Sequence, residues 1–391
     1  MAEPVAMPVP EALFASLRVG GVELPNRIAM APMTRSFCGP QGVPDAAVAR
    51  YYAARAATGT GLLFTEGTVV DMASARGYRG VPGLCDDAQE AAWRAVVDAV
   101  HAAGGRIMVQ LWHCGRLAHP RATGDAQPLA PSALTASGPY IDAADPGTFD
   151  GHLAYVEPRA MTQTDIDAVV ASFAQAAARA RRAGFDGVLL HGASGYLIHQ
   201  FFNPDSNRRQ DDYNGDAAAR ARFACEVVAA VRGELGGEVP LLMGLSQFAV
   251  NDFAAKTWHT PVELAATVQC LKAAGVDGFH VAAHRIDTPA FAVDADPQQR
   301  SLAWHVRQLS GLPVSAAGGV TYSTSIGESL MGADSQVTDP AEAAAALQAQ
   351  AVDLIAVGRA MLANPDWTAK VRAGRWRELT PFRREMLASL V

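Results

Sequence analysis

Eight short apolar runs, separated by segments of helical periodicity, constrain the fold of this chain more than any other feature. Each run has five or six residues and is rich in Val, Ile, Leu, Met or Ala. Continuous apolar runs of this length are typical of strands that are buried on both faces, as in a parallel sheet. The runs are Arg27–Ala31, Gly61–Glu66, Arg106–Leu111, Gly187–His191, Pro240–Leu245, Gly278–Ala282, Pro313–Ala317 and Asp353–Val357.

The segments between the runs carry helix signals. Asp165–Ala183 follows Thr162 and Thr164, which can cap a helix start, and it ends at Gly184, a residue suited to a helix C-terminus. The other predicted helices are Asp87–Ala103, Ala218–Arg232, Pro261–Ala274, Leu302–Leu309 and Pro340–Gln350, with Pro261 and Pro340 in the first turn.

Eight strands alternating with helices predict an α/β chain with a closed TIM (β/α)₈ barrel, a single domain over residues 1–391. The alternative is a doubly wound open sheet, which would need a GxGxxG turn after a strand. Gly59 and Gly61 begin that pattern, but Phe64 stands where the third glycine belongs.

The connection over residues 112–164, between the third and fourth strands, is too long for a loop and one helix. It contains PLAPSAL, SGPY and further Pro, Gly and Asp residues. Long irregular segments at a barrel mouth often form lids or substrate walls, so we expect a capping insertion. The alternative, to which we give equal weight, is an irregular surface loop without a functional role.

Charge and cysteine content narrow the class of protein. The net charge is −7 and the five cysteines form no CxxC pair, which argues against a nucleic-acid partner, a disulfide framework and a structural metal site. The N-terminus lacks the pattern of a signal peptide, and no apolar stretch reaches membrane-spanning length. These features predict a cytoplasmic protein with a small-molecule substrate, and they leave homo-oligomer formation open.

The seventh and eighth runs end in glycines, which predicts a phosphate site. Gly318 and Gly319 follow the seventh run, and Gly358 and Arg359 follow the eighth. Many barrels hold a phosphate at these two loops through backbone N–H groups, and Arg359 adds a forked cation. Ordinary turns with a surface arginine are the alternative.

Seven further segments are distinctive: LPNRIAMAPMTR (24–35), YYAARA (51–56), GLLFTEG (61–67), QLWHCGR (110–116), HGASGYLIHQFFNPDSNRRQDDYNG (191–215), ARFACEVVAAVR (221–232) and VGRAMLANPDW (357–367). Together they resemble the Old Yellow Enzyme family, in family order from about residue 12 to about residue 375.

The resemblance implies an FMN held without a covalent bond at the barrel mouth, reduced by NADH or NADPH, and reduction of an activated C=C bond. Four positions take named roles in this family. His191 matches the residue that binds the substrate oxygen, and Tyr196 matches the proton donor; Trp112 and Ser194 complete the substrate pocket. The residues that the family uses for FMN match Pro32, Met33, Thr34, Gly67, Gln110, Gly318, Gly319, Gly358 and Arg359.

Two positions depart from the family pattern. Ser194 stands where the family usually has Asn or His, and Gly244 stands where it usually has an arginine that faces the flavin. Arg285 or Lys256 is then the expected replacement cation. These departures raise three alternatives: desaturation or isomerisation, a member that has lost flavin chemistry, and a non-catalytic binding barrel. A metal-dependent hydrolase, using histidines such as His113, His191, His280 and His284, is the alternative from another class.

Overall fold

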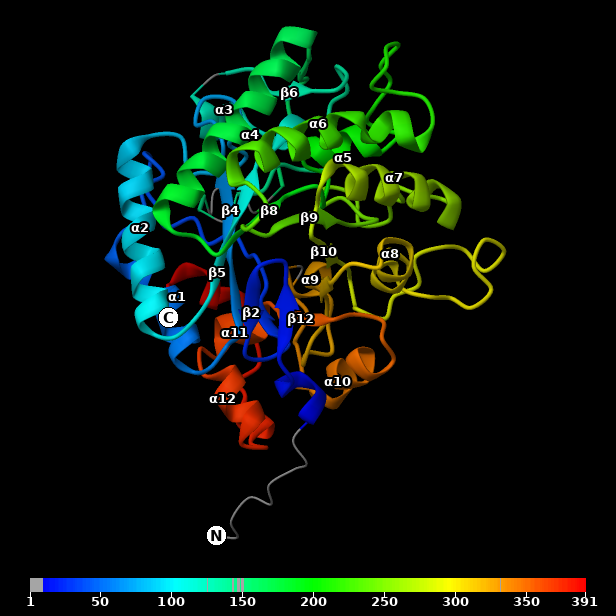
Figure 1. The fold of residues 1–391 in the computed structure, drawn as a ribbon. Coiled ribbons are helices and arrows are strands. Elements are labelled where there is room, and N and C mark those ends of the chain that lie inside the picture. Colours follow the sequence, from blue (N-terminus) through cyan, green and yellow to red (C-terminus); the bar gives the residue numbers. More distant parts are fainter. Residues whose placement is uncertain (1–9, 125, 143, 146–147, 149–150, 331) are drawn as a thin grey trace.

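The centre of the molecule is a closed barrel of eight parallel strands with helices around it (Figure 1). The structure, a computed structural model, describes residues 10–391 except 125, 143, 146–147, 149–150 and 331. The barrel strands are β3 (Ile28–Met30), β4 (Leu62–Val69), β5 (Ile107–Trp112), β8 (Gly187–Leu190), β9 (Leu241–Leu245), β10 (Gly278–Ala282), β11 (Val314–Ala317) and β12 (Leu354–Val357). All eight predicted runs are barrel strands, and because β12 pairs with β3 the open-sheet alternative is wrong.

The surrounding helices confirm the predicted segments and add others. Thr162 forms a capping box with Asp165, and Gly184 ends the same helix with a left-handed backbone. Pro340 is a correction: it lies at the N-cap, one residue before the helix. The longer helices are α1 (Ala46–Ala57), α2 (Asp87–Ala102), α4 (Gln163–Ala183), α6 (Ala217–Leu235), α7 (Pro261–Ala274), α8 (Leu302–Ser310) and α10 (Ala341–Gln348). Shorter ones are α3 (Pro120–Thr123), α5 (Leu197–Phe202), α9 (Ile326–Leu330), α11 (Arg359–Ala363) and α12 (Trp367–Arg372).

Alternate residues of each barrel strand face the helices or the barrel interior, which sets what reaches the mouth. Phe279 and Val281 of β10 belong to the outer core between barrel and helices. The interior core is a separate cluster that includes Leu62, Phe64, Met108, Leu189, Leu242 and Leu354. An unpredicted hairpin of β1 (Leu17–Val19) and β2 (Val22–Leu24) adds Val19 and Leu24 to that cluster. A Cβ at Gly20 of its turn would lie 3.0 Å from the side chain of Pro240, directly before β9, so the hairpin packs closely against the amino end of the barrel.

Three strand pairs are joined at the amino end by the same arrangement, which we call a clasp. The aspartates Asp186, Asp277 and Asp353 directly precede β8, β10 and β12. Each carboxylate accepts the first backbone N–H of the preceding barrel strand, at 2.7, 2.8 and 3.1 Å. Each also pairs with a side chain from the last turn of the helix that leads into that preceding strand, respectively His101 of α2, Arg232 of α6 and Arg307 of α8.

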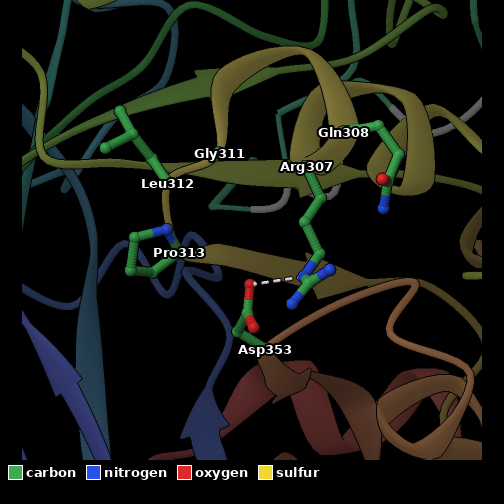
Figure 2. Close-up of a pocket in the computed structure, with 6 residues that line it drawn as sticks. All are labelled: Arg307, Gln308, Gly311, Leu312, Pro313 and Asp353. Atoms are coloured by element: carbon green, nitrogen blue, oxygen red, sulfur yellow. Dashed lines mark hydrogen bonds and ion pairs between the residues drawn. The ribbon is translucent and has the colours of Figure 1, made fainter.

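Figure 2 shows the Arg307–Asp353 pair of the third clasp, which lies in a surface hollow lined by residues such as Arg307, Pro313 and Asp353. Arg307 Nε lies 3.0 Å from Asp353 Oδ2. Both Pro313 and Asp353 directly precede strands, so the hollow lies at the end of the barrel opposite the predicted site. Its charged groups already hold one another, and we assign the hollow to stability.

The segment between β5 and α4 contains α3 and a two-stranded sheet of β6 (Leu129–Ala130) and β7 (Arg159–Ala160). Its residues Tyr140 and Tyr155 share an apolar cluster with Trp112 and Tyr196 at the carboxyl end of the barrel. Coverage of a bound substrate by this segment stays a prediction. In the part of the chain that the structure describes, no helix has the length and apolar character needed to cross a membrane.

Candidate active site at the carboxyl end of the barrel

The predicted site residues lie along one arc of the barrel mouth, although they are scattered through the sequence. They lie at or near the carboxyl ends of six strands that are neighbours around the barrel, in the order β11, β12, β3, β4, β5 and β8. Along this arc the residues are Gly318 and Gly319; Gly358 and Arg359; Pro32, Met33 and Thr34; Gly67; Gln110 and Trp112; and His191, with Ser194 and Tyr196 in the following loop.

Three of them form an aromatic group at one end of the arc. The ring centroid of Tyr196 lies 4.8 Å from that of Trp112 and 4.8 Å from that of His191. The centroids of Trp112 and His191 lie 6.0 Å apart. A Cβ at Gly67 would lie 2.3 Å from the Trp112 ring, so only glycine fits beside the indole at this position. Tyr78, which the sequence did not point to, completes the group: its hydroxyl oxygen lies 3.1 Å from that of Tyr196.

The protonation states in this group follow from burial. Desolvation raises the pKa of Tyr196 well above its ordinary value, while the hydrogen bond from Tyr78 partly opposes that rise. Desolvation also lowers the pKa of His191 to about 3, with a smaller contribution from His280. At neutral pH the site therefore presents a protonated phenol beside a neutral imidazole. The Nδ1 of His191 and the Nε1 of Trp112 are buried without a hydrogen-bond partner among the described residues.

The inward positions around most of the mouth have almost no side chain. Alternation along the strands places small residues there on β3, β9, β10, β11 and β12: Ala31, Gly244, Ala282, Ala317, Ala356 and Gly358. Across from them, Gln110 is buried, and its side-chain amide has no hydrogen-bond partner within the described chain. A rim of Ala and Gly facing an unpaired amide fits a flat, polar-edged ring system.

The loop after β3 is anchored by a buried carboxylate that the sequence analysis gave no role. Glu66 Oε2 accepts the backbone N–H groups of Arg35 and Ser36, at 2.8 and 2.9 Å. The Tyr52 hydroxyl in turn accepts the N–H of Glu66 at 2.8 Å. Desolvation raises the pKa of Glu66 to about 7, although the two backbone bonds oppose it. Glu66 therefore fixes the chain directly after Pro32, Met33 and Thr34.

The Ser194 backbone is held in a left-handed conformation, with φ of 62°. Its N–H donates to Ser246 Oγ at 2.7 Å, and its carbonyl accepts the N–H of Val250 at 3.0 Å. This turn brings Tyr196 back toward His191. Gly318 is required for another close approach, because a Cβ there would lie 2.5 Å from the Ala283 carbonyl oxygen.

Three cations expected at the mouth are engaged elsewhere in this structure. The guanidinium of Arg359 donates to Thr324 and Ser329, so its predicted phosphate contact would require exchange of these partners. Arg285 pairs with Asp287 and Glu342, and Lys256 donates to the Ala290 carbonyl. Neither Arg285 nor Lys256 therefore replaces the family arginine at Gly244 here.

Two of the four histidines considered for a metal site have other partners. His113 Nδ1 accepts the N–H of Gly115 at 3.0 Å, and His284 Nε2 lies 3.1 Å from the Phe253 carbonyl. No group of three or more His, Cys, Asp or Glu side chains among the described residues is arranged to hold a metal ion.

Comparison with known sequences agrees with this geometry. A sequence model of the NADH:flavin oxidoreductase / NADH oxidase family matches residues 12–378. The chain is 30% identical to an NADH oxidase of Thermoanaerobacter brockii over 94% of this chain and 52% of that protein. It is 46% identical to a chanoclavine-I aldehyde reductase of Penicillium roqueforti over 58% of each. The chain thus spans between half and two thirds of the length of these two relatives.

A flavin oxidoreductase of Emericella nidulans matches over more of its length, at 34% identity across 96% of this chain and 93% of that protein. Among solved structures, morphinone reductase superposes with a TM-score of 0.74 at 34% identity, covering 93% of this chain and 90% of the other. The Old Yellow Enzyme homologue of Zymomonas mobilis gives 0.79 at 30% identity, covering 96% of each. The chain therefore belongs to the NADH:flavin oxidoreductase / NADH oxidase family, whose structures include the Old Yellow Enzymes.

Proposed function

We propose that this chain is an FMN-dependent oxidoreductase that uses NADH or NADPH to reduce a C=C bond activated by a carbonyl or similar group. The observation that carries the proposal is the pairing of a protonated phenol, Tyr196, with a neutral imidazole, His191, at a mouth lined by Ala and Gly. A phenol and an imidazole at this separation can serve two different atoms of one small substrate.

The residues at the mouth fit FMN. Gln110, with its unpaired amide, and the backbone and hydroxyl of Pro32, Met33 and Thr34 would hold the polar edge of the ring, which Gly67 would border. Gly318, Gly319, Gly358 and Arg359 would hold the phosphate. When bound, FMN supplies a carrier that accepts a hydride from the nicotinamide and delivers it to the alkene.

His191 and Tyr196 would supply the hydrogen bond to the substrate oxygen and the proton that complete the reduction. Hydride addition to a conjugated alkene builds negative charge on the conjugated oxygen, and the neutral His191 N–H can donate to that oxygen. Tyr196 would then give its hydroxyl proton to the neighbouring carbon, so that the alkene gains one hydride and one proton. The Tyr78 hydroxyl would donate to the resulting phenolate, which otherwise lies in an apolar group. Trp112 and Ser194 would form the pocket wall.

The test is a visible spectrum of the purified protein with FMN. We expect flavin absorbance that anaerobic NADH or NADPH bleaches and that 2-cyclohexen-1-one, a simple enone, restores. Protein that stays colourless with added FMN would overturn the flavoenzyme proposal. Bound flavin that NAD(P)H bleaches, but that no enone reoxidises, would instead favour a different oxidative half-reaction.

A further inference from the structure

Two buried imidazoles flank a position that has no side chain. Leu190 pairs with Met243 across β8 and β9, so His191 stands beside Gly244. Gly244 itself pairs with His280 across β9 and β10. His191, Gly244 and His280 therefore form one row, and the row has a gap over Gly244.

One ring nitrogen of His280 has no hydrogen-bond partner in this arrangement. The side chain is 3% exposed, its ring centroid lies 5.2 Å from that of Phe64, and Nδ1 lies 3.2 Å from Ser315 Oγ. Nε2 has no hydrogen-bond partner within the described chain, and the same holds for Nδ1 of His191. Nδ1 of His191 is buried as well as unpaired, which is costly unless a ligand pairs with it. Nε2 of His280 is unpaired but not fully enclosed, so a ligand at the barrel mouth can reach it.

The described residues that neighbour His280 in the barrel carry no fixed charge. The elements packed against His280 present Gly244 from β9, Ser315 from β11 and Phe64 from β4, and His191 is a titratable neighbour that interacts with it. Burial lowers the pKa of His280 to about 4, so without a ligand both imidazoles are neutral at physiological pH. A negative charge over Gly244 would favour the protonated imidazole instead.

We propose that His280 contacts the polar edge of the FMN ring through Nε2 and takes up a proton when the flavin is reduced. This rests on the proposed function. The nicotinamide hydride brings two electrons and one proton to the ring, which leaves a negative charge, and solvent supplies the second proton to His280. On reoxidation the hydride leaves for the substrate and His280 returns its proton to solvent, so that the cycle balances. Packing on Phe64 with no cofactor contact is the alternative.

The experiment compares His280→Gln with His305→Gln, a matched control. His305 is also buried, but it lies on α8 and pairs with Asp296. The readouts are FMN affinity and the number of protons taken up per two electrons, from the pH dependence of the midpoint potential at neutral to mildly alkaline pH. We expect the native chain and His305→Gln to take up two protons per two electrons, and His280→Gln to take up one. FMN should bind about tenfold more weakly to His280→Gln, because one hydrogen bond to the ring is lost.

The outcomes separate the two proposals. Absence of FMN binding and of bleaching by NAD(P)H would overturn the proposed function. Bound, reducible FMN with equal proton counts in the native chain and His280→Gln would overturn the inference alone. If His280→Gln does not fold, NMR of ¹⁵N-histidine in the native holoenzyme decides instead. Nε2 and Nδ1 of His280 must change from the neutral to the protonated pattern on reduction, and an unchanged pattern would contradict the inference.

Discussion

The hydroxyl oxygens of Tyr78 and Tyr196 lie 3.1 Å apart, 118 positions apart in the sequence. Tyr196 also meets Trp112 edge to face, while Tyr78 stacks beside the same indole, with centroids 5.7 Å apart. The two phenols therefore hold each other and the tryptophan in one arrangement. This fixes the direction of the Tyr196 hydroxyl before any substrate arrives.

Replacement of Tyr196 by Phe should remove the proton donor and preserve the packing. We expect the rate of enone reduction to fall roughly 10²–10⁴-fold, the usual contribution of a general acid. Bleaching of the flavin by NAD(P)H needs no proton from this residue and should change little. Stopped-flow measurement of the two half-reactions checks this, and an equal fall in both would point to a structural role.

Replacement of Tyr78 by Phe should have a smaller effect on the same half-reaction. The Tyr196 hydroxyl stays in place but loses the donor that stabilises its phenolate, so we expect a fall of about tenfold for one hydrogen bond. The pH profile gives the specific readout. Because Tyr78 lowers the pKa of Tyr196, its loss should raise the alkaline limit of enone reduction. An unshifted limit with a normal rate would show that the contact is only packing.

Glu66 should make stability depend on pH near neutrality. Its folded pKa, about 7, exceeds its ordinary value of 4.5, so between these values the unfolded chain releases a proton that the folded chain keeps. This stabilising effect is complete below pH 4.5 and is lost as pH rises through 7. Glu66→Gln can still accept the two backbone N–H groups, but it cannot titrate. Urea unfolding of both proteins at pH 5, 6 and 7 checks this: relative to Glu66→Gln, the native chain should lose stability as the pH rises.

The buried histidines should change the free energy of unfolding with pH in the direction opposite to Glu66. Desolvation lowers the pKa of His113 and His280 to about 4, and of His191 and His199 to about 3. Below pH 6.5 the unfolded chain binds protons that the folded chain does not, so stability is present above 6.5 and is lost toward pH 4. Each histidine contributes up to about 1.4 kcal/mol per pH unit.

The measurement is urea unfolding of the native chain and of His113→Gln between pH 6.5 and 4. The slope of the unfolding free energy against pH reports how many protons the chain takes up on unfolding. In the variant this number should be smaller by about one. An identical slope in the two proteins would contradict the neutral state of His113.

A clasp at the amino end should matter for stability and leave the chemistry alone. Asp353→Ala leaves Arg307 and the Val314 N–H without their carboxylate, and hydrogen bonds to charged groups contribute about 1.5–3 kcal/mol. The control is Asp212→Ala, which removes a carboxylate with an 85% exposed side chain from an ion pair with Arg222 and should cost at most about 1 kcal/mol. Denaturant unfolding gives both values, and flavin reduction by NAD(P)H should be normal in both variants.

Much of the fold could be predicted because a barrel strand is buried on both faces and therefore appears as one apolar run. Residues that follow such runs meet at one end of the barrel, which brought His191 and Gln110 to the same mouth. The roles of Tyr78 and Glu66 could not be predicted in this way, because their contacts join distant loops and follow no period. The β1–β2 hairpin has three-residue strands, too short for a pattern. The partners of Arg359 also depend on how the loop that carries Thr324 is folded.

The three clasps each tie one strand to its next neighbour in the chain: β5 to β8, β9 to β10, and β11 to β12. None of these carboxylates ties one such pair to the next. The barrel wall therefore contains three two-strand modules, each stabilised by its own aspartate. Chimeras between relatives should tolerate crossover points between modules, before α6 or after β10, better than crossover points inside one, where an aspartate and its strand would come from different parents.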